Sequence, residues 1–141
     1  MNPQLGAALA AEEAAIYAYG LLGVHLGGRG DVTEARAAEQ THRGRRDFLV
    51  AKLAQLKASA APSPAGYQLP FPVTDRASAL KLAIHVEDGV AQAWRPLLPA
   101  STGADRTTAL AAMTEAAVRA TRWRRLAAVS PVTLPFPGRP E

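Results

Sequence analysis

The 141-residue sequence contains no cysteine. Disulfide bonds, thiolate metal sites and thiol nucleophiles are therefore excluded. Alternation of apolar and polar residues, the pattern of a half-buried β-strand, is also missing. No Gly-x-Ser-x-Gly motif occurs, so a hydrolase triad carried on a strand is not recognisable. These absences leave a helical protein that is stabilised by its core alone.

Long uncharged apolar runs are missing as well. Glu12 and Glu13 interrupt the first apolar stretch, and no run reaches the roughly 20 apolar residues that a membrane span requires. The first four residues carry no basic segment of the kind that opens a signal peptide. We therefore expect a cytoplasmic protein that has no membrane partner.

Alanine and leucine, both strong helix formers, recur at spacings of three and four residues. This periodicity predicts four helices, at about residues 3–26, from 31 to a linker at 59, at 74–98 and at 104–128. Asp31 and Glu34 match the spacing of a capping box for the second helix. Thr74 and Asp75 are both good N-caps for the third helix, which is predicted to start at one of them, and Pro96 should end or kink it.

The connections indicate how the helices are joined. Residues 59–73 are rich in proline and cannot be helical. Extended at about 3.3 Å per residue, they reach about 50 Å, enough to cross a bundle about 36 Å long. The connections at 27–30 and 99–103 are short and typical of antiparallel hairpins. We predict an all-α fold with a single domain over residues 1–141: a ferritin-like antiparallel four-helix bundle whose two hairpins are joined by the crossover at 59–73, followed by an extended tail at 129–141.

A short repeat accompanies these two irregular segments. The tetrapeptide Leu-Pro-Phe-Pro occurs at residues 69–72 and again at 134–137. Proline fixes the chain in an extended conformation, so we expect each copy to lay its phenylalanine against the bundle. Trp94 and Trp123 are predicted to be core or interface aromatics, and His85 a surface residue.

Five segments together resemble one family. They are AEEAAIYAYG at 11–20, HRGRRD at 42–47, YQLPFPV at 67–73, AVRA at 117–120 and PFPG at 135–138. In this order they resemble the DUF4439 family, an actinobacterial family of ferritin-like proteins of unknown function. The resemblance covers nearly the whole chain. It implies a ferritin-like four-helix bundle and implies no reaction.

Each predicted helix also carries a carboxylate where its apolar stripe is interrupted. Di-iron bundles use one Glu from each of two helices and Glu-x-x-His from each of the other two. The candidate metal ligands here are Glu12, Glu39, His42, Glu87 and Glu115. The second histidine is missing, because position 118 is valine. Iron or another divalent metal in such a site would support an oxidase or ferroxidase.

The predicted level of the side chains along the first hairpin argues against that site. A turn centred near Arg29 places Glu12 level with Arg45 and Arg46, which predicts charge-assisted pairs between them. The same register places Glu39 and His42 several residues away from Glu12, and bridging metal ligands do not tolerate such an offset.

Tyrosine and arginine offer partners for the remaining carboxylates. The register places Tyr17 and Tyr19 beside Glu39, to which either could donate a hydrogen bond. In the second hairpin, Glu87 is predicted to lie level with Glu115, and Arg119 lies one helical turn from Glu115. A row of buried carboxylates neutralised by arginines therefore explains the polar positions without a metal ion.

Two arginine clusters remain: residues 43, 45 and 46, and residues 119, 122, 124 and 125. They permit an anionic partner, yet they form no clean stripe and lack the interleaved aromatic residues of single-strand binders, so nucleic acid is not favoured. We expect a non-catalytic structural or interaction protein, a homodimer, with no cofactor and no identifiable small-molecule substrate. The alternative is the di-iron type oxidase or ferroxidase.

Overall fold

The computed structural model describes residues 1–140, which form helices and connecting loops without any strand. The prediction of an all-helical protein is confirmed, while residue 141, the last of the predicted tail, lies outside the described part. The elements are α1 (Asn2–Leu22), η1 (Gly23–His25, a 3₁₀ turn), α2 (Arg29–Gln55), α3 (Arg76–Trp94), α4 (Leu97–Ala100) and α5 (Gly103–Leu126).

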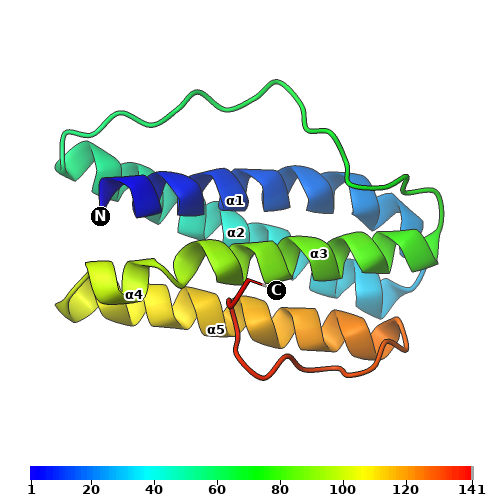
Figure 1. Cartoon of the computed structure of the whole chain (residues 1–141). Helices are drawn as coiled ribbons and strands as arrows, with labels where there is room; N and C mark the ends of the chain where they lie inside the picture. The colour runs from blue at the N-terminus through cyan, green and yellow to red at the C-terminus, as the bar shows by residue number, and fades with distance from the viewer. Residues whose placement is uncertain (141) are drawn as a thin grey trace.

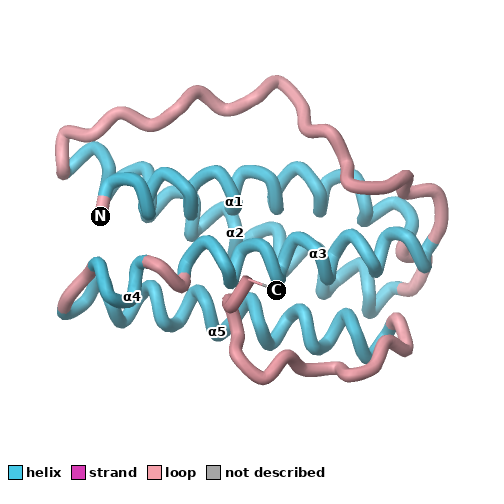
Figure 2. Tube along the Cα trace, in the orientation of Figure 1, coloured by secondary structure: helices cyan, strands magenta, loops and turns pink. Residues whose placement is uncertain are grey.

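The four long helices lie side by side as a bundle (Figure 1). Close backbone contacts join α1 to α2, α1 to α3 and α3 to α5. The connection between α2 and α3 arches along the outside of α1, from one end of the bundle to the other (Figure 2). The remaining side, where α2 faces α5, is linked by ion pairs between side chains: Arg45–Glu115 at 2.7 Å, Lys52–Asp105 at 2.6 Å and Arg122–Glu34 at 3.9 Å.

The start of α2 differs from the prediction. Gly28 is its N-cap, in an extended conformation, and no side chain caps the helix. The predicted Asp31–Glu34 capping box is therefore wrong. Asp31 lies inside the first turn instead, where its carboxylate accepts a hydrogen bond of 2.8 Å from the Arg76 guanidinium at the start of α3.

The boundaries of α3 follow the sequence signals. The Asp75 carboxylate accepts a hydrogen bond of 2.8 Å from the Ser78 backbone N–H, and the Ser78 hydroxyl accepts one from the Asp75 N–H. These two bonds form a capping box. At the other end, α3 stops at Trp94, two residues before Pro96, because proline can neither donate a helical hydrogen bond nor avoid the preceding turn.

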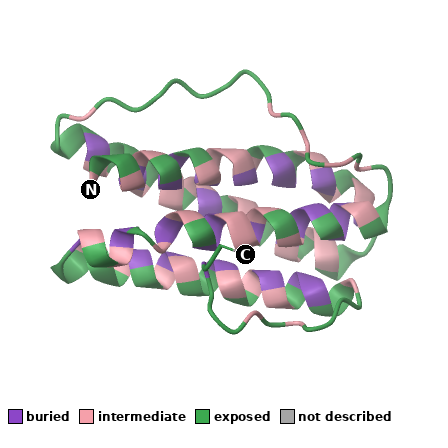
Figure 3. Cartoon of the chain, viewed as in Figure 1, coloured by how far each residue is buried: buried purple, intermediate pink, exposed green. Residues whose placement is uncertain are grey.

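Buried residues face the centre of the bundle, whereas the connection and the tail are largely exposed (Figure 3). The core consists of two apolar clusters. The first cluster takes its largest side chains from Leu5, Leu9, Leu49, Leu53, Trp94 and Leu97. The second takes them from Tyr19, Leu22, Leu26, Leu80, Leu82 and Trp123. Because neighbouring helices run in opposite directions, the two clusters occupy opposite ends of the bundle.

The first helix also meets a membrane criterion. By length and composition alone, the stretch Asn2–His25 is the one helix among the described residues that could cross a membrane. The core helix of a soluble protein passes the same test, and this stretch carries Glu12 fully buried inside the bundle. The buried residues of this stretch, Glu12 among them, face the other helices of the bundle.

The two Leu-Pro-Phe-Pro copies behave differently. The ring of Phe71 lies on α3, with the Lys81 ammonium 4.6 Å above its centroid and His85 at its edge. His85 is exposed, as predicted. The expectation is wrong for Phe136, which remains 56% exposed.

The tail that carries Phe136 is nevertheless held on α3. The Arg95 guanidinium donates a hydrogen bond of 2.8 Å to the Pro137 carbonyl. Gly138 is buried with φ of +75°, and a Cβ atom at this position would meet the Ala91 carbonyl oxygen at 2.6 Å. Only glycine allows the chain to approach α3 this closely.

Replacing this glycine therefore tests how the tail is attached. We expect Gly138→Ala to release the tail and to lower the free energy of unfolding by about 1–2 kcal/mol, because alanine is strained at positive φ. Urea denaturation and hydrogen exchange of residues 132–139 measure both effects. Gly66→Ala is the control, because its Cβ would meet no atom within 4 Å. Unchanged exchange in the Gly138 variant would contradict this account of the tail.

Candidate functional site

Three of the five predicted site residues meet at the centre of the bundle. Glu12 from α1, His42 from α2 and Glu87 from α3 are each 0% exposed. The His42 ring lies between the two carboxylates: Nδ1 is 2.5 Å from Glu12 Oε2, and Nε2 is 2.9 Å from Glu87 Oε1. A single imidazole thus joins three helices.

Glu87 has two further donors. The Arg119 Nε–H of α5 donates to both of its oxygens, at 3.0 and 3.1 Å. The Tyr19 hydroxyl of α1 donates at 3.0 Å. Glu87 is therefore bonded to α1, α2 and α5 at once, and Arg119 brings the fourth long helix into the same arrangement.

Two indoles complete the hydrogen bonding. Trp94 Nε1–H donates to Glu12 Oε1 at 2.6 Å, and Trp123 Nε1–H donates to the Tyr19 hydroxyl at 2.8 Å. Trp94 and Trp123 were predicted only as core aromatics, and their polar role was missed. One signal could have found it, because a buried indole N–H requires an acceptor and Trp94 lies two helical turns from Glu87 on the same face.

We call this set of seven side chains the polar core network: Glu12, Tyr19, His42, Glu87, Trp94, Arg119 and Trp123. Two of its members are carboxylates and two are cations when His42 is protonated, so its formal charge is then zero. Such a balance matters because an isolated buried ion costs several kcal/mol. Trp94 belongs to the first apolar cluster, and Tyr19 and Trp123 belong to the second, so the network connects the two clusters of the core.

The protonation of His42 follows from its neighbours. Burial alone would lower the pKa of the imidazole. The hydrogen bonds and negative charges of Glu12 and Glu87 outweigh burial and raise the pKa of His42 to about 9. Burial likewise opposes ionisation of Glu87, but His42 and Arg119 together hold the pKa of its carboxyl below the usual value. At neutral pH the centre is an imidazolium between two carboxylates.

The predicted register of the first hairpin is wrong. Glu12 and His42 are equidistant along the chain from Gly27, so the turn is centred two residues before Arg29. The cause is the start of α2 at Arg29, two residues before the predicted start at Asp31, which moves the centre of the connection toward the N-terminus. Glu12 is consequently neutralised by His42, and the predicted pairing with Arg45 or Arg46 does not occur: those arginines bind Glu115 and Asp47.

Glu39 and Glu115 lie outside the network. Glu39 faces the groove between α1 and α2 and lies 3.6 Å from the Arg43 guanidinium. The predicted hydrogen bond from Tyr17 or Tyr19 to Glu39 is wrong for Tyr19, which donates to Glu87. The side chain of Glu115 is 47% exposed and pairs with Arg45, so its predicted meeting with Glu87 does not occur either.

The donor set can be compared with what a di-iron centre needs. Both nitrogens of His42 already face carboxylates, so an imidazolium there offers no lone pair to a metal ion. Arg119 covers both oxygens of Glu87. Among residues 1–140, no group of three or more His, Cys, Asp or Glu side chains has a metal-holding arrangement. The residues present do not fit a carboxylate-bridged metal pair.

Several of the clustered arginines form ion pairs with acidic side chains of the same chain. Arg45, Arg119 and Arg124 pair with Glu115, Glu87 and Asp88, respectively. Arg124 is 7% exposed, so this guanidinium forms part of the core surface. These ion pairs support the interpretation of both clusters as internal neutralising groups.

Comparison with known proteins gives a family and a relative without an assigned reaction. The family model described as "Domain of unknown function (DUF4439)" matches residues 4–141. The crystal structure of a conserved hypothetical protein, rv2844, from Mycobacterium tuberculosis superposes with a TM-score of 0.83 at 41% sequence identity, covering 89% of this chain and 95% of that chain. None of the curated proteins compared with the chain matches it.

The raised pKa of His42 predicts how stability depends on pH. In the unfolded chain His42 titrates near 6.5, so the stabilisation by the imidazolium is complete below that pH and is lost as pH rises through about 9. We expect the free energy of unfolding to fall by up to about 3 kcal/mol across this window. Urea denaturation at a series of pH values measures it. His42→Gln should abolish this slope, and His85→Gln should retain it; a flat wild-type profile would contradict the assignment.

Removing one charge from the centre should cost far more than removing one from the surface. Glu87→Gln leaves Arg119 and His42 with a single carboxylate, and we expect a loss of about 3–5 kcal/mol. Glu115→Gln, which removes a half-exposed partner of Arg45, should cost less than about 1 kcal/mol. Both are measured by chemical denaturation at pH 7. Equal losses in the free energy of unfolding for the two variants would show that the buried ion pairs stabilise the fold no more than a surface ion pair does.

Proposed function

Because the chain belongs to the DUF4439 family, whose function is unknown, we propose a function from its own core. In this proposal the protein is a ferritin-like four-helix bundle that serves as a non-catalytic structural and interaction protein. Side-chain cations, His42 and Arg119, take the place that metal ions have in di-iron bundles. The observation that carries this proposal is the bonding of both His42 nitrogens to buried carboxylates.

The ferritin-like part of the proposal rests on connectivity. Two pairs of neighbouring helices, α1 with α2 and α3 with α5, are each joined by a short connection, and one long connection runs the length of the bundle between the pairs (Figure 1). A single long crossover is characteristic of ferritin-like bundles. Carboxylates that point into the bundle centre from α1 and α3 also match that architecture.

The non-catalytic part rests on how completely the polar atoms are used. Every titratable side chain of the network has a partner within the network. A general acid or base must instead reach a substrate, and Glu12, His42 and Glu87 have no exposed surface. The network supports cohesion between helices and leaves the outer surface of the bundle for contact with a partner.

The runner-up is a di-iron type oxidase or ferroxidase, which is favoured by one observation: Glu12, His42 and Glu87 converge from three helices on one point. Metal analysis separates the two functions. Protein expressed with iron, manganese and zinc should contain less than about a tenth of an equivalent of metal, and added metal should not raise its melting temperature. One or more equivalents, lost in both Glu12→Gln and Glu87→Gln, would replace the proposal with the metal-dependent function.

A further inference from the structure

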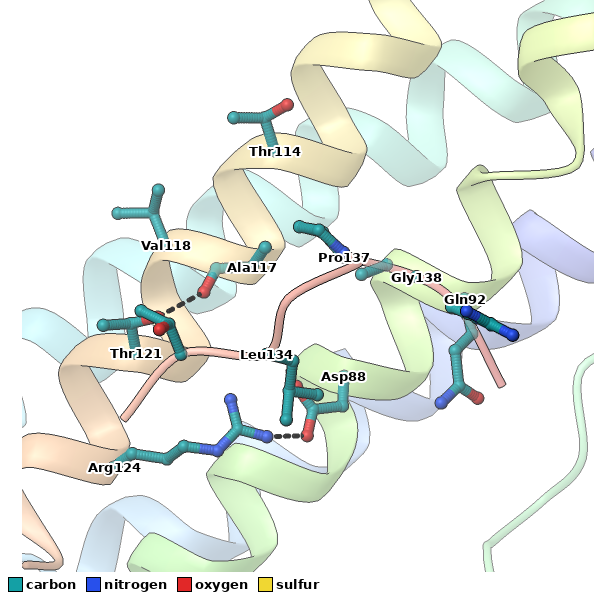
Figure 4. A pocket seen from close by; sticks show the side chains of 13 residues that line it. Asp88, Gln92, Thr114, Ala117, Val118, Thr121, Arg124, Leu134, Pro137 and Gly138 are labelled. Atoms are coloured by element: carbon teal, nitrogen blue, oxygen red, sulfur yellow. Dashed lines mark hydrogen bonds and ion pairs between the residues drawn. The ribbon is translucent and has the colours of Figure 1, made fainter. Parts of the chain in front are cut away.

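A cleft of about 220 Å³ lies between the C-terminal tail and the helices α3 and α5 (Figure 4). Its apolar walls come from Ala91 of α3, from Ala117 and Val118 of α5, and from Leu134 and Pro137 of the tail. Alanine on both helices leaves this space open. The tail is fixed over it by Gly138 and by the Arg95–Pro137 hydrogen bond described above.

Three charged residues line the cleft: Asp88, Arg124 and Arg139. The Arg124 guanidinium of α5 donates to the Asp88 carboxylate of α3 (Figure 4), and the Arg139 guanidinium lies over the Phe136 ring of the tail. The Asp88–Arg124 pair is electrically balanced and does not call for a charged ligand. Most of the remaining lining is apolar, with the Gln92 amide, the Arg139 guanidinium and threonine hydroxyls at positions 114, 121 and 133 beside it.

The exposed face of α5 extends this surface. Thr107, Leu110, Thr114 and Val118 succeed one another at helical spacing without a charged residue among them, and Leu110 and Val118 are 50% and 45% exposed. A solvated helix face normally carries charges. An uncharged face beside an apolar cleft is instead typical of an interaction site.

Phe136 projects from the same tail. It is flanked by Pro135 and Pro137, which restrict the backbone before any partner binds. Arg139 stands 5.4 Å from the ring centroid, yet the residue keeps 56% of its surface exposed. Phe71, in the other copy of the tetrapeptide, packs on a helix. The same motif therefore has a docked ring in one copy and an open ring in the other.

We propose that Phe136 of one chain inserts into this cleft of a second copy of the chain, and that the reciprocal insertion closes a twofold dimer. This proposal names the partner for the interaction role proposed above and rests on it. Apolar cavities of about 150 Å³ hold a benzene ring, so the cleft has room for a phenylalanine side chain. Each copy carries both the projecting ring and the cleft, as a self-complementary twofold interface requires.

The expected assembly is a dimer at micromolar concentration, measured by sedimentation velocity. Phe136→Ala should weaken dimerisation by about 30-fold or more, the effect of losing an anchor residue at an interface. Its circular dichroism spectrum should stay unchanged, since the ring is mostly exposed, and its melting temperature should lose only the dependence on protein concentration that dimerisation confers. Val24→Ala, which truncates an 81% exposed residue next to the first turn, is the matched control and should leave the dimer intact.

Blocking the cleft provides a second, independent variant. Ala117→Leu should fill the cleft and also abolish dimerisation, and Thr114→Leu at the cleft's exposed edge replaces it if the first variant does not fold. Phe136→Ala chains have a cleft without a ring, whereas Ala117→Leu chains have a ring without a cleft. Mixing the two monomeric variants should restore a heterodimer through the one intact contact.

Three results would overturn the proposal: a wild-type monomer, a dimer that survives Phe136→Ala, or variants that do not complement when mixed. Binding of benzene by a monomeric wild-type chain, lost in Ala117→Leu, would instead assign the cleft to a small apolar ligand. Metal analysis remains separate. A metal-free monomer would overturn the proposed dimer but not the assignment of the core. A metal-loaded dimer would overturn the assignment of the core but not the proposed dimer.

Discussion

The bundle depends on the imidazolium of His42, which lies between the carboxylates of Glu12 and Glu87. Each carboxylate is fully buried, so each would be strongly destabilising without a cation in contact. The ring uses its two nitrogens in opposite directions and therefore fixes α2 against α1 and α3 simultaneously. A shift of α2 by one residue moves the ring about 1.5 Å along the axis, which is enough to break both short bonds. Arg119 joins α5 to the same Glu87, so side chains around one point connect all four long helices.

This constraint matters because the helices are rich in alanine. Buried alanines at positions 8, 15, 18, 35, 38, 79, 83, 91, 109, 112, 116 and 120 let the helices approach closely but interdigitate little, so apolar packing alone distinguishes poorly between neighbouring registers. Leucine concentrates in the two apolar clusters of the core, and the polar core network connects these clusters through Tyr19, Trp94 and Trp123. Directional hydrogen bonds supply the specificity there that small apolar side chains cannot.

The sequence was sufficient to predict the helices, but it was insufficient to predict how far each helix is shifted along its axis relative to its neighbours. Periodicity identified the faces that bury Glu12, His42 and Glu87, and Asp75 and Pro96 marked the ends of α3. The axial position depended on the turn, because α2 begins at Arg29, two residues earlier than predicted, and the hairpin is therefore centred on Gly27. With this difference in register, Glu12 pairs with His42 and not with the predicted arginine. Tyr19 likewise donates to Glu87 and not to the predicted Glu39. The hydrogen-bonding roles of Trp94 and Trp123 depend on the same register, so they could not be predicted before the register was known.

A cation built into the chain has consequences that a bound metal does not. A metal-dependent bundle has an apo form in which its carboxylates repel one another, so its stability varies with metal supply. Here His42 and Arg119 accompany the carboxylates as the helices assemble, and the centre is neutral whenever the chain is folded near pH 7. An imidazolium that is hydrogen-bonded through both of its nitrogens has no lone pair to offer a metal ion. The contacts that stabilise the core thus also leave Glu12, His42 and Glu87 without exposed surface.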